Sequence, residues 1–139
     1  MDSKKKGIVT EIETMLAFVR LGYPVLTPYG DNERYDYIVD VDGKFVKIQC
    51  KSAHTINNGE SFMFDTRSAT RNSEGNDHHI YTADEVDYFA TAYNGQCYLI
   101  PVGVYAASAK LRLIPGKNGH SYGAAWAKDY ELEKIVKTW

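Results

Sequence analysis

The feature that most constrains the fold is an Asp42-Gly43 pair between two runs of alternating apolar and polar residues. The runs are Tyr37-Ile38-Val39-Asp40-Val41 and Lys44-Phe45-Val46-Lys47-Ile48. Asp-Gly in this setting is the strongest short-range signal for a two-residue β-hairpin. The turn also fixes the register of the two strands, because it places Val41 opposite Lys44.

One face of this hairpin is predicted to be polar. Counting back from the turn sets Asp36 opposite Gln49, with Lys51 as a diagonal neighbour on the same face. The opposite face is apolar, as in a half-buried sheet, and carries Tyr37, Val39, Val41, Val46, Ile48 and Cys50. A solvated strand face also carries charges, so the hairpin alone does not separate a functional patch from a solvent-exposed one.

An N-terminal helix is predicted between Gly7 and Leu21, where apolar residues recur with helical spacing. The apolar arc, which we expect to face the core, consists of Ile8, Ile12, Met15, Leu16, Phe18 and Val19. Glu11 lies inside this arc, whereas Glu13 lies outside it. A carboxylate on a core-facing stripe is costly unless a cation or hydrogen-bond donors meet it. A metal site and a buried structural ion pair would each satisfy Glu11, and the sequence leaves both open.

The rest of the chain predicts an α/β sheet within a single domain, residues 1–139. An extended segment is expected at 24–28, strands at 61–65, 88–93, 97–102 and 110–114, and a helical patch at 126–135. Thr82-Ala83-Asp84-Glu85 has the capping-box pattern of a helical turn, and Asn94-Gly95 predicts a second hairpin. Residues 67–79 form a long polar segment without periodicity, which we interpret as a mobile loop.

Composition excludes several classes of protein. The apolar run Met15–Val19 is too short to span a bilayer, and nearby glutamates interrupt a signal peptide. The 2 cysteines are too few for a disulfide framework, so we expect a reduced, intracellular (cytoplasmic) protein. The 4 histidines lack the spacing of a zinc site.

Taken together, these residues resemble the PD-(D/E)XK nuclease core. The matching features are Gly7-x-x-x-Glu11 opening a helix, Asp36 at the head of a strand, and Gln49-Cys50-Lys51. Gln49 stands where most members carry Asp or Glu. The stretch from Gly30 to Asp36 and Thr66-Arg67-Ser68 resemble the small homing endonucleases of group I introns. The similarity covers residues 7 to 132 and implies a restriction-endonuclease-like core, with a mixed central sheet, flanking helices and an N-terminal helix.

The resemblance implies a Mg²⁺-dependent, site-specific endonuclease of double-stranded DNA. The catalytic residues would be Glu11, Asp36, Gln49 and Lys51. Mg²⁺ prefers oxygen ligands, and these would come from Glu11, Asp36, Gln49 and the backbone carbonyl of Cys50. Lys51 would orient or deprotonate the attacking water. Because Gln49 replaces a carboxylate with a neutral amide, we expect weaker metal binding.

The formal net charge of −2 argues against a sequence-indifferent polycation but does not exclude DNA binding, since local potential matters more than the total. Arg34, Arg67 and Arg71 are the expected DNA contacts. The resemblance also implies a homo-oligomer, dimer or tetramer, because so small a domain covers only part of a long target. Two alternatives stay open: a Holliday-junction resolvase-like nuclease, and a non-catalytic DNA-binding or protein-interaction module on a nuclease scaffold, which Gln49 favours.

Overall fold

The structure, a computed structural model, describes residues 1–72, 75–115 and 125–139. Two of its elements, labelled η1 and η3, are 3₁₀-helices. In chain order the elements are α1 Ser3–Arg20, β1 Val25–Leu26, β2 Tyr37–Val41, β3 Lys44–Cys50, β4 His54–Ile56, η1 Asn57–Gly59, β5 Ser61–Asp65, β6 Arg67–Asn72, β7 Gly75–Ile80, β8 Tyr88–Tyr93, β9 Gln96–Pro101, β10 Ser108–Arg112, η3 Ala127–Tyr130 and α2 Leu132–Val136. No helix in the described ranges is long and apolar enough to cross a membrane.

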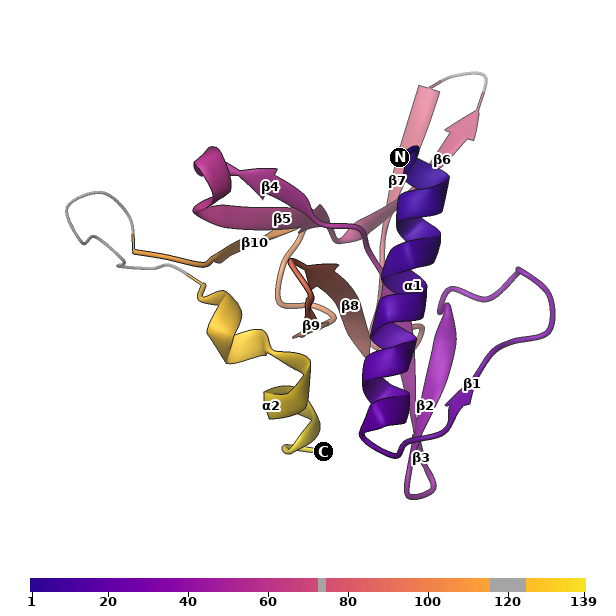
Figure 1. The fold of residues 1–139 in the computed structure, drawn as a ribbon. Helices are drawn as coiled ribbons and strands as arrows, with labels where there is room; N and C mark the ends of the chain where they lie inside the picture. Colours follow the sequence, from indigo (N-terminus) through magenta and orange to yellow (C-terminus); the bar gives the residue numbers. More distant parts are fainter. Residues whose placement is uncertain (73–74, 116–124) are drawn as a thin grey trace.

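A mixed five-stranded sheet with the order β1-β2-β3-β8-β9 forms the centre of the fold (Figure 1). β3 and β8 run parallel, while the other neighbours are antiparallel. Helices α1 and α2 pack on one face, where Phe18, Val39, Ile48 and Leu132 belong to one core cluster. The other face of the sheet packs against strands β5 and β10 of a three-stranded sheet, and together they form a second core cluster. The predicted α/β class with a mixed central sheet and an N-terminal helix is confirmed.

Both predicted hairpins form, and the first has the expected register. Val41 pairs with Lys44, and the ladder continues back to Tyr37 opposite Ile48. Asp42 and Gly43 have φ angles of 53° and 93°, the left-handed conformation that this tight turn requires. Asn94-Gly95 turns in the same way between β8 and β9. Two-residue turns therefore set the pairing within both hairpins of the central sheet.

Other segments differ from the sequence prediction. Residues 67–72 and 75–79 are not a loop, because β6 and β7 pair from Arg67 opposite Ile80 to Asn72 opposite Gly75, and residues 73–74 lie outside the described ranges. Since residues 77–80 are exposed, this ribbon shows no apolar alternation that the sequence could reveal. Strand β4 was not predicted, and β10 begins two residues before the strand expected at 110–114. The predicted helical turn is present, as the Val86 N–H donates to the Thr82 carbonyl over 3.1 Å.

Helix α1 turns a different face to the core from the one that its apolar residues predict. The buried residues are Thr10, Thr14 and Phe18. Ile8 and Ile12 are instead 58% and 55% exposed, and Leu16 and Val19 are also exposed. Phe18 and Met15 of the predicted arc do face the core, whereas Ile8, Ile12, Leu16 and Val19 do not, so the arc is only partly right as the core-facing stripe. Threonine can take the place of apolar residues on the buried side of α1, because its hydroxyl donates to a carbonyl of the same helix. Thr10 donates to Lys6 and Thr14 to Glu11, both over 3.0 Å.

A buried hydrogen-bond network around Thr14 holds α1 against the hairpin. The Tyr37 hydroxyl donates to Thr14 Oγ1 over 2.9 Å, and Cys50 Sγ lies 3.3 Å from the same oxygen. Since Thr14 gives its only proton to the Glu11 carbonyl, it accepts from both partners. Burial raises the pKa of Tyr37 and raises that of Cys50 to about 12, so both partners keep the protons that they donate.

We expect Thr14→Val to lower the free energy of unfolding by about 1–3 kcal/mol, because it leaves the buried Tyr37 hydroxyl without an acceptor. The double variant Thr14→Val/Tyr37→Phe should lose less than the sum of the two single variants, since both ends of the bond are then absent. Urea unfolding of wild type, the two single variants and the double variant measures these losses of stability. Thr10→Val is the control, because that hydroxyl bonds only within α1; additive losses would contradict the network.

Candidate functional site

Asp36 lies immediately before β2, where the hairpin ladder ends. Its N–H donates to the Ile48 carbonyl over 2.8 Å, and its Oδ2 accepts the Cys50 N–H over 2.7 Å. The carboxylate thus extends the pairing of β2 with β3 by one further bond and is held in a fixed orientation. Burial raises the pKa of Asp36, although the Cys50 N–H and the nearby Lys51 charge oppose the rise.

Lys51 follows the last residue of β3. Its N–H donates to the Ala90 carbonyl of β8 over 2.9 Å, and its Nζ donates to the Arg67 carbonyl over 2.8 Å. The ammonium therefore joins the central sheet to the first residue of the β6–β7 ribbon. Burial lowers the pKa of Lys51, while Asp65 and Asp36 oppose this effect and Arg34 adds to it.

Glu11 reaches this region from α1. Its side chain is half-buried, and burial, followed by the charge of Asp36, raises its pKa. Within the described residues Glu11 forms no ion pair with a lysine or arginine, which weighs against a buried structural ion pair. Glu11 and Asp36 line a common pocket, which Asp31 and Glu33 also line.

Gln49 lies on β3 and does not line the pocket that Asp36 shares with Glu11. It lines a second pocket together with Asp36, Glu33, Arg34, Ser68, His79 and Tyr81. Asp36 and Glu33 thus belong to two pockets, one shared with Glu11 and the other with Gln49. The structure places Glu11, Gln49 and Lys51 around Asp36, whereas the Cys50 thiol contacts Thr14 of α1.

The residues around Asp36 offer oxygen donors to a metal ion. Within residues 1–72, 75–115 and 125–139, no three His, Cys, Asp or Glu side chains form a group that could hold a metal. The donors here are the Glu11 and Asp36 carboxylates, the Gln49 amide and the backbone carbonyl of Cys50. This set, without sulfur or imidazole, fits a hard cation such as Mg²⁺.

The three expected DNA-contacting arginines lie in different settings. The Arg34 guanidinium carbon sits 4.0 Å from the centroid of the Tyr81 ring, and Nη1 lies 3.5 Å from Glu85 Oε2. Arg67 begins β6, and its Nε lies 3.4 Å from Asp65 Oδ1. Arg71 is also on β6, but its side chain lies outside the described part of the structure.

Tyr81 is a residue of this site that the sequence analysis does not identify, because its sequence pattern is that of a core or sheet residue. The residue is indeed buried and belongs to a core cluster. Its ring also faces two cations, because Lys51 Nζ lies 5.1 Å from the centroid on which Arg34 stacks. An aromatic residue in a core pattern gives no sequence signal for such a second contact.

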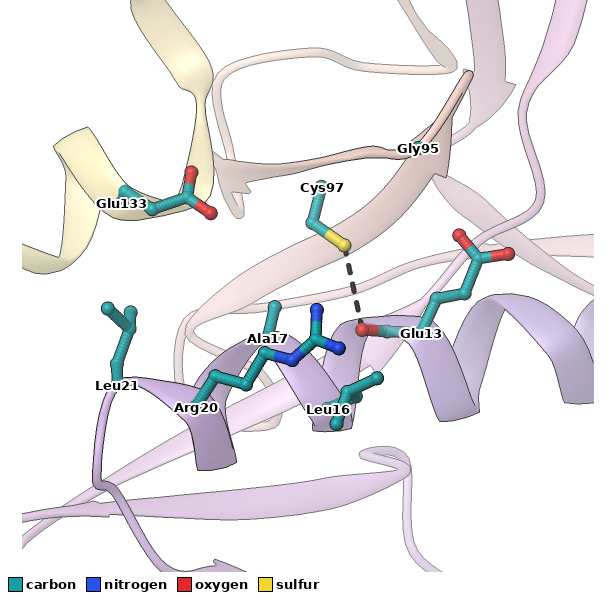
Figure 2. A pocket seen from close by; sticks show the side chains of 8 residues that line it. All are labelled: Glu13, Leu16, Ala17, Arg20, Leu21, Gly95, Cys97 and Glu133. Carbon is teal, nitrogen blue, oxygen red and sulfur yellow. Dashed lines mark hydrogen bonds between the residues drawn. The ribbon is translucent and has the colours of Figure 1, made fainter.

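A separate pocket lies between α1, the turn before β9 and α2 (Figure 2). Cys97 Sγ donates to the Glu13 carbonyl at its edge over 3.7 Å. Burial, together with Glu13 and Glu133, raises the pKa of Cys97 to about 11. A thiol that stays protonated is neither a nucleophile nor a metal ligand, so this pocket lacks the chemistry found around Asp36.

Comparison with known proteins gives two findings. A family model described as PD-(D/E)XK endonuclease matches residues 1–133. The solved structure of a bacterial homing endonuclease, I-Ssp6803I, has a similar fold, with a TM-score of 0.79 and 21% identity over 99% of this chain and 93% of that one. At this identity the likeness shows the fold alone. A search of curated proteins found no match.

The raised pKa of Asp36 predicts how stability depends on pH without metal. A carboxyl group whose pKa is higher in the folded than in the unfolded protein stabilises the fold at low pH, and this contribution is lost as pH rises through the raised pKa. We therefore expect Asp36→Asn, whose amide oxygen can still accept the Cys50 N–H, to be more stable than wild type at neutral pH in EDTA.

Urea unfolding in EDTA across a pH series measures this difference, which should vanish below about pH 4, where the wild-type carboxyl is also neutral. Asp42→Asn, in the exposed hairpin turn, is the matched control. A loss of stability in Asp36→Asn that is equal at every pH would mean that the carboxylate serves only as a structural acceptor.

Proposed function

The chain belongs to the PD-(D/E)XK endonuclease family, and we propose that it is a Mg²⁺-dependent endonuclease that cuts double-stranded DNA at specific sites. The observation that carries this proposal is that Glu11, Gln49 and Lys51 lie around Asp36: Glu11 and Gln49 each share a pocket with Asp36, and the charge of Lys51 acts on the Asp36 carboxyl. The likeness in fold to a bacterial homing endonuclease supports it.

The two carboxylates would hold the metal together with the Gln49 amide oxygen and the Cys50 carbonyl. When bound, Mg²⁺ supplies a Lewis acid that offsets charge on the phosphate. Burial and, second to it, repulsion by Asp36 raise the pKa of Glu11, and a divalent cation would relieve that repulsion. Gln49 contributes an oxygen without a charge, so the site binds metal more weakly and depends more on the DNA phosphate for the remaining ligands.

Lys51 is the residue that acts on the attacking water. Hydrolysis of a phosphodiester requires this water to lose a proton while negative charge develops on the phosphate oxygens. The Lys51 Nζ is held at the site by its hydrogen bond to the Arg67 carbonyl. The lowered pKa of Lys51 makes its neutral amine, which accepts a proton, more accessible, and its ammonium form offsets the developing charge.

DNA would be contacted by Arg34 in the second pocket and by Arg67 and Arg71 on the β6–β7 ribbon. The ribbon forms its own two-stranded sheet, and residues 77–80 of β7 are exposed. A two-stranded β-ribbon fits the major groove of B-DNA, where base edges are distinguishable. The ribbon is therefore the element that we propose reads the DNA sequence.

We further propose that the protein acts as a homo-oligomer, because so small a domain covers only part of a long target. Helix α1 supplies a surface for this contact. Its exposed face carries Ile8, Ile12, Leu16 and Val19, and contiguous exposed apolar residues mark interaction sites in soluble proteins.

Cleavage of plasmid DNA in Mg²⁺ tests the catalytic residues. Asp36→Asn and Lys51→Ala should each lose cleavage by about a hundredfold or more while the fold persists, because each removes a group that acts on the reacting atoms. Glu11→Gln should also impair cleavage, whereas Glu13→Gln, on the same helix but outside the site, should not.

Three results would overturn this assignment. Folded variants that cut at the wild-type rate would remove these residues from the reaction. A wild-type protein that cuts four-way junctions but not linear duplex would favour the resolvase alternative, and one that binds duplex without cutting would favour the non-catalytic scaffold.

Mass measurement by light scattering tests the oligomer. We expect wild type to be a dimer or tetramer and Ile12→Glu/Leu16→Glu to be monomeric, because charge on both partners would disrupt an apolar contact. Ile114→Glu is the control, at an isoleucine that is 50% exposed but outside α1. A monomeric wild type, free and on DNA, would contradict the oligomer; an unchanged mass in the double variant would exclude the α1 face.

A further inference from the structure

Arg34 has hydrogen-bonding capacity that the protein does not use. Its Nη1 pairs with Glu85, but its Nε and Nη2 are buried atoms that have no hydrogen-bond partner within the described residues. A guanidinium has five N–H donors in a fixed plane, and buried donors without a partner are costly. The residue lines the pocket of Asp36 and Gln49, so an acceptor bound in that pocket would meet it.

Contacts on two sides hold Arg34 in place. Its plane lies over the Tyr81 ring, at 4.0 Å from the centroid. Glu85 is itself fixed, because its Oε1 accepts the Thr82 N–H over 3.1 Å and the Thr82 hydroxyl over 3.2 Å. The Tyr81 ring is in turn fixed edge-on against Phe89, with centroids 5.5 Å apart. This arrangement restricts Arg34 to one orientation, which reduces the entropy lost on binding.

The same ring brings a second cation to the pocket. Lys51 Nζ lies 5.1 Å from the Tyr81 centroid, so two like charges share one aromatic platform. Attraction of each cation to the ring quadrupole offsets part of their repulsion. An anion with several oxygens would offset the rest, and the planar donors of arginine match phosphate oxygens.

We propose that Tyr81 is a positioning residue, which holds the Arg34 guanidinium so that it binds a backbone phosphate of DNA in the pocket formed by Glu33, Arg34, Asp36, Gln49, Ser68 and Tyr81. This inference rests on the proposed nuclease function and assigns it a phosphate subsite beside the metal ligands. Tyr81 acts through its ring face and through Arg34, without touching the reacting atoms.

The test is binding of a duplex that contains the cleavage site, in Ca²⁺ across a salt series. Arg34→Ala should flatten the slope of log affinity against log salt by about 0.9, the value of one phosphate contact. Tyr81→Leu should flatten it similarly, whereas Tyr81→Phe, which keeps the ring, should bind like wild type. The double variant Arg34→Ala/Tyr81→Leu should be no weaker than Arg34→Ala alone, since the ring acts through the arginine.

Arg34→Lys keeps the test valid if Tyr81→Leu proves unstable in urea. Lysine retains the charge but loses the stacked, bidentate geometry, so affinity should fall about tenfold, as for one lost charge-assisted hydrogen bond. Arg20→Ala is the control for charge, because Arg20 is exposed and lines the separate pocket on α1.

The outcomes separate the subsite from the function. Three results would each overturn the role of Tyr81 and leave the nuclease proposal standing. The first is wild-type binding in Arg34→Lys or Tyr81→Leu, and the second is a loss in Tyr81→Phe equal to that in Tyr81→Leu. The third is additive losses in the double variant. If wild type has no affinity for duplex at any salt concentration, both proposals are wrong.

Discussion

The hydrogen bonds of Thr14 are the interaction on which the site depends. One hydroxyl donates to the Glu11 carbonyl and accepts from Tyr37 and Cys50, so it uses its full capacity in a buried place. This fixes the rotation of α1 about its axis. Cys50 also donates its backbone N–H to Asp36, and therefore the same strand residue positions the helix through its thiol and the carboxylate through its amide. A polar network, rather than the apolar arc, decides which side of α1 is buried.

The hairpin and the residues around it could be predicted from the sequence because the rules involved are local. A two-residue turn sets the register, and strand periodicity then determines which side chains share a face. From Asp42-Gly43 alone, Asp36 and Gln49 follow as neighbours at the open end of the hairpin, with Lys51 beyond them. The structure adds one detail that counting cannot supply: Asp36 pairs with β3 through its side chain as well as its backbone.

The features that sequence reasoning missed depend on contacts far apart in the chain. Thr14 belongs to the core only because Tyr37 meets it, and hydropathy assigns threonine no such role. The β6–β7 ribbon is stabilised by backbone pairing, which leaves no periodic trace when the side chains of β7 stay exposed. Tyr81 is a core residue, but its buried ring also contacts Arg34 and Lys51 beside Asp36. Membership of the core and participation in binding are not exclusive.

The distribution of charge around Asp36 explains how a chain of net charge −2 can be suited to a polyanion. On one side Glu11, Asp31, Glu33 and Asp36 line one pocket. On the other side Arg34 and Lys51 share the Tyr81 ring. A divalent cation held by the carboxylates would reduce their repulsion of a DNA phosphate, and a phosphate held by Arg34 would attract the cation. Metal and DNA are therefore expected to bind cooperatively, because each ligand attracts the other.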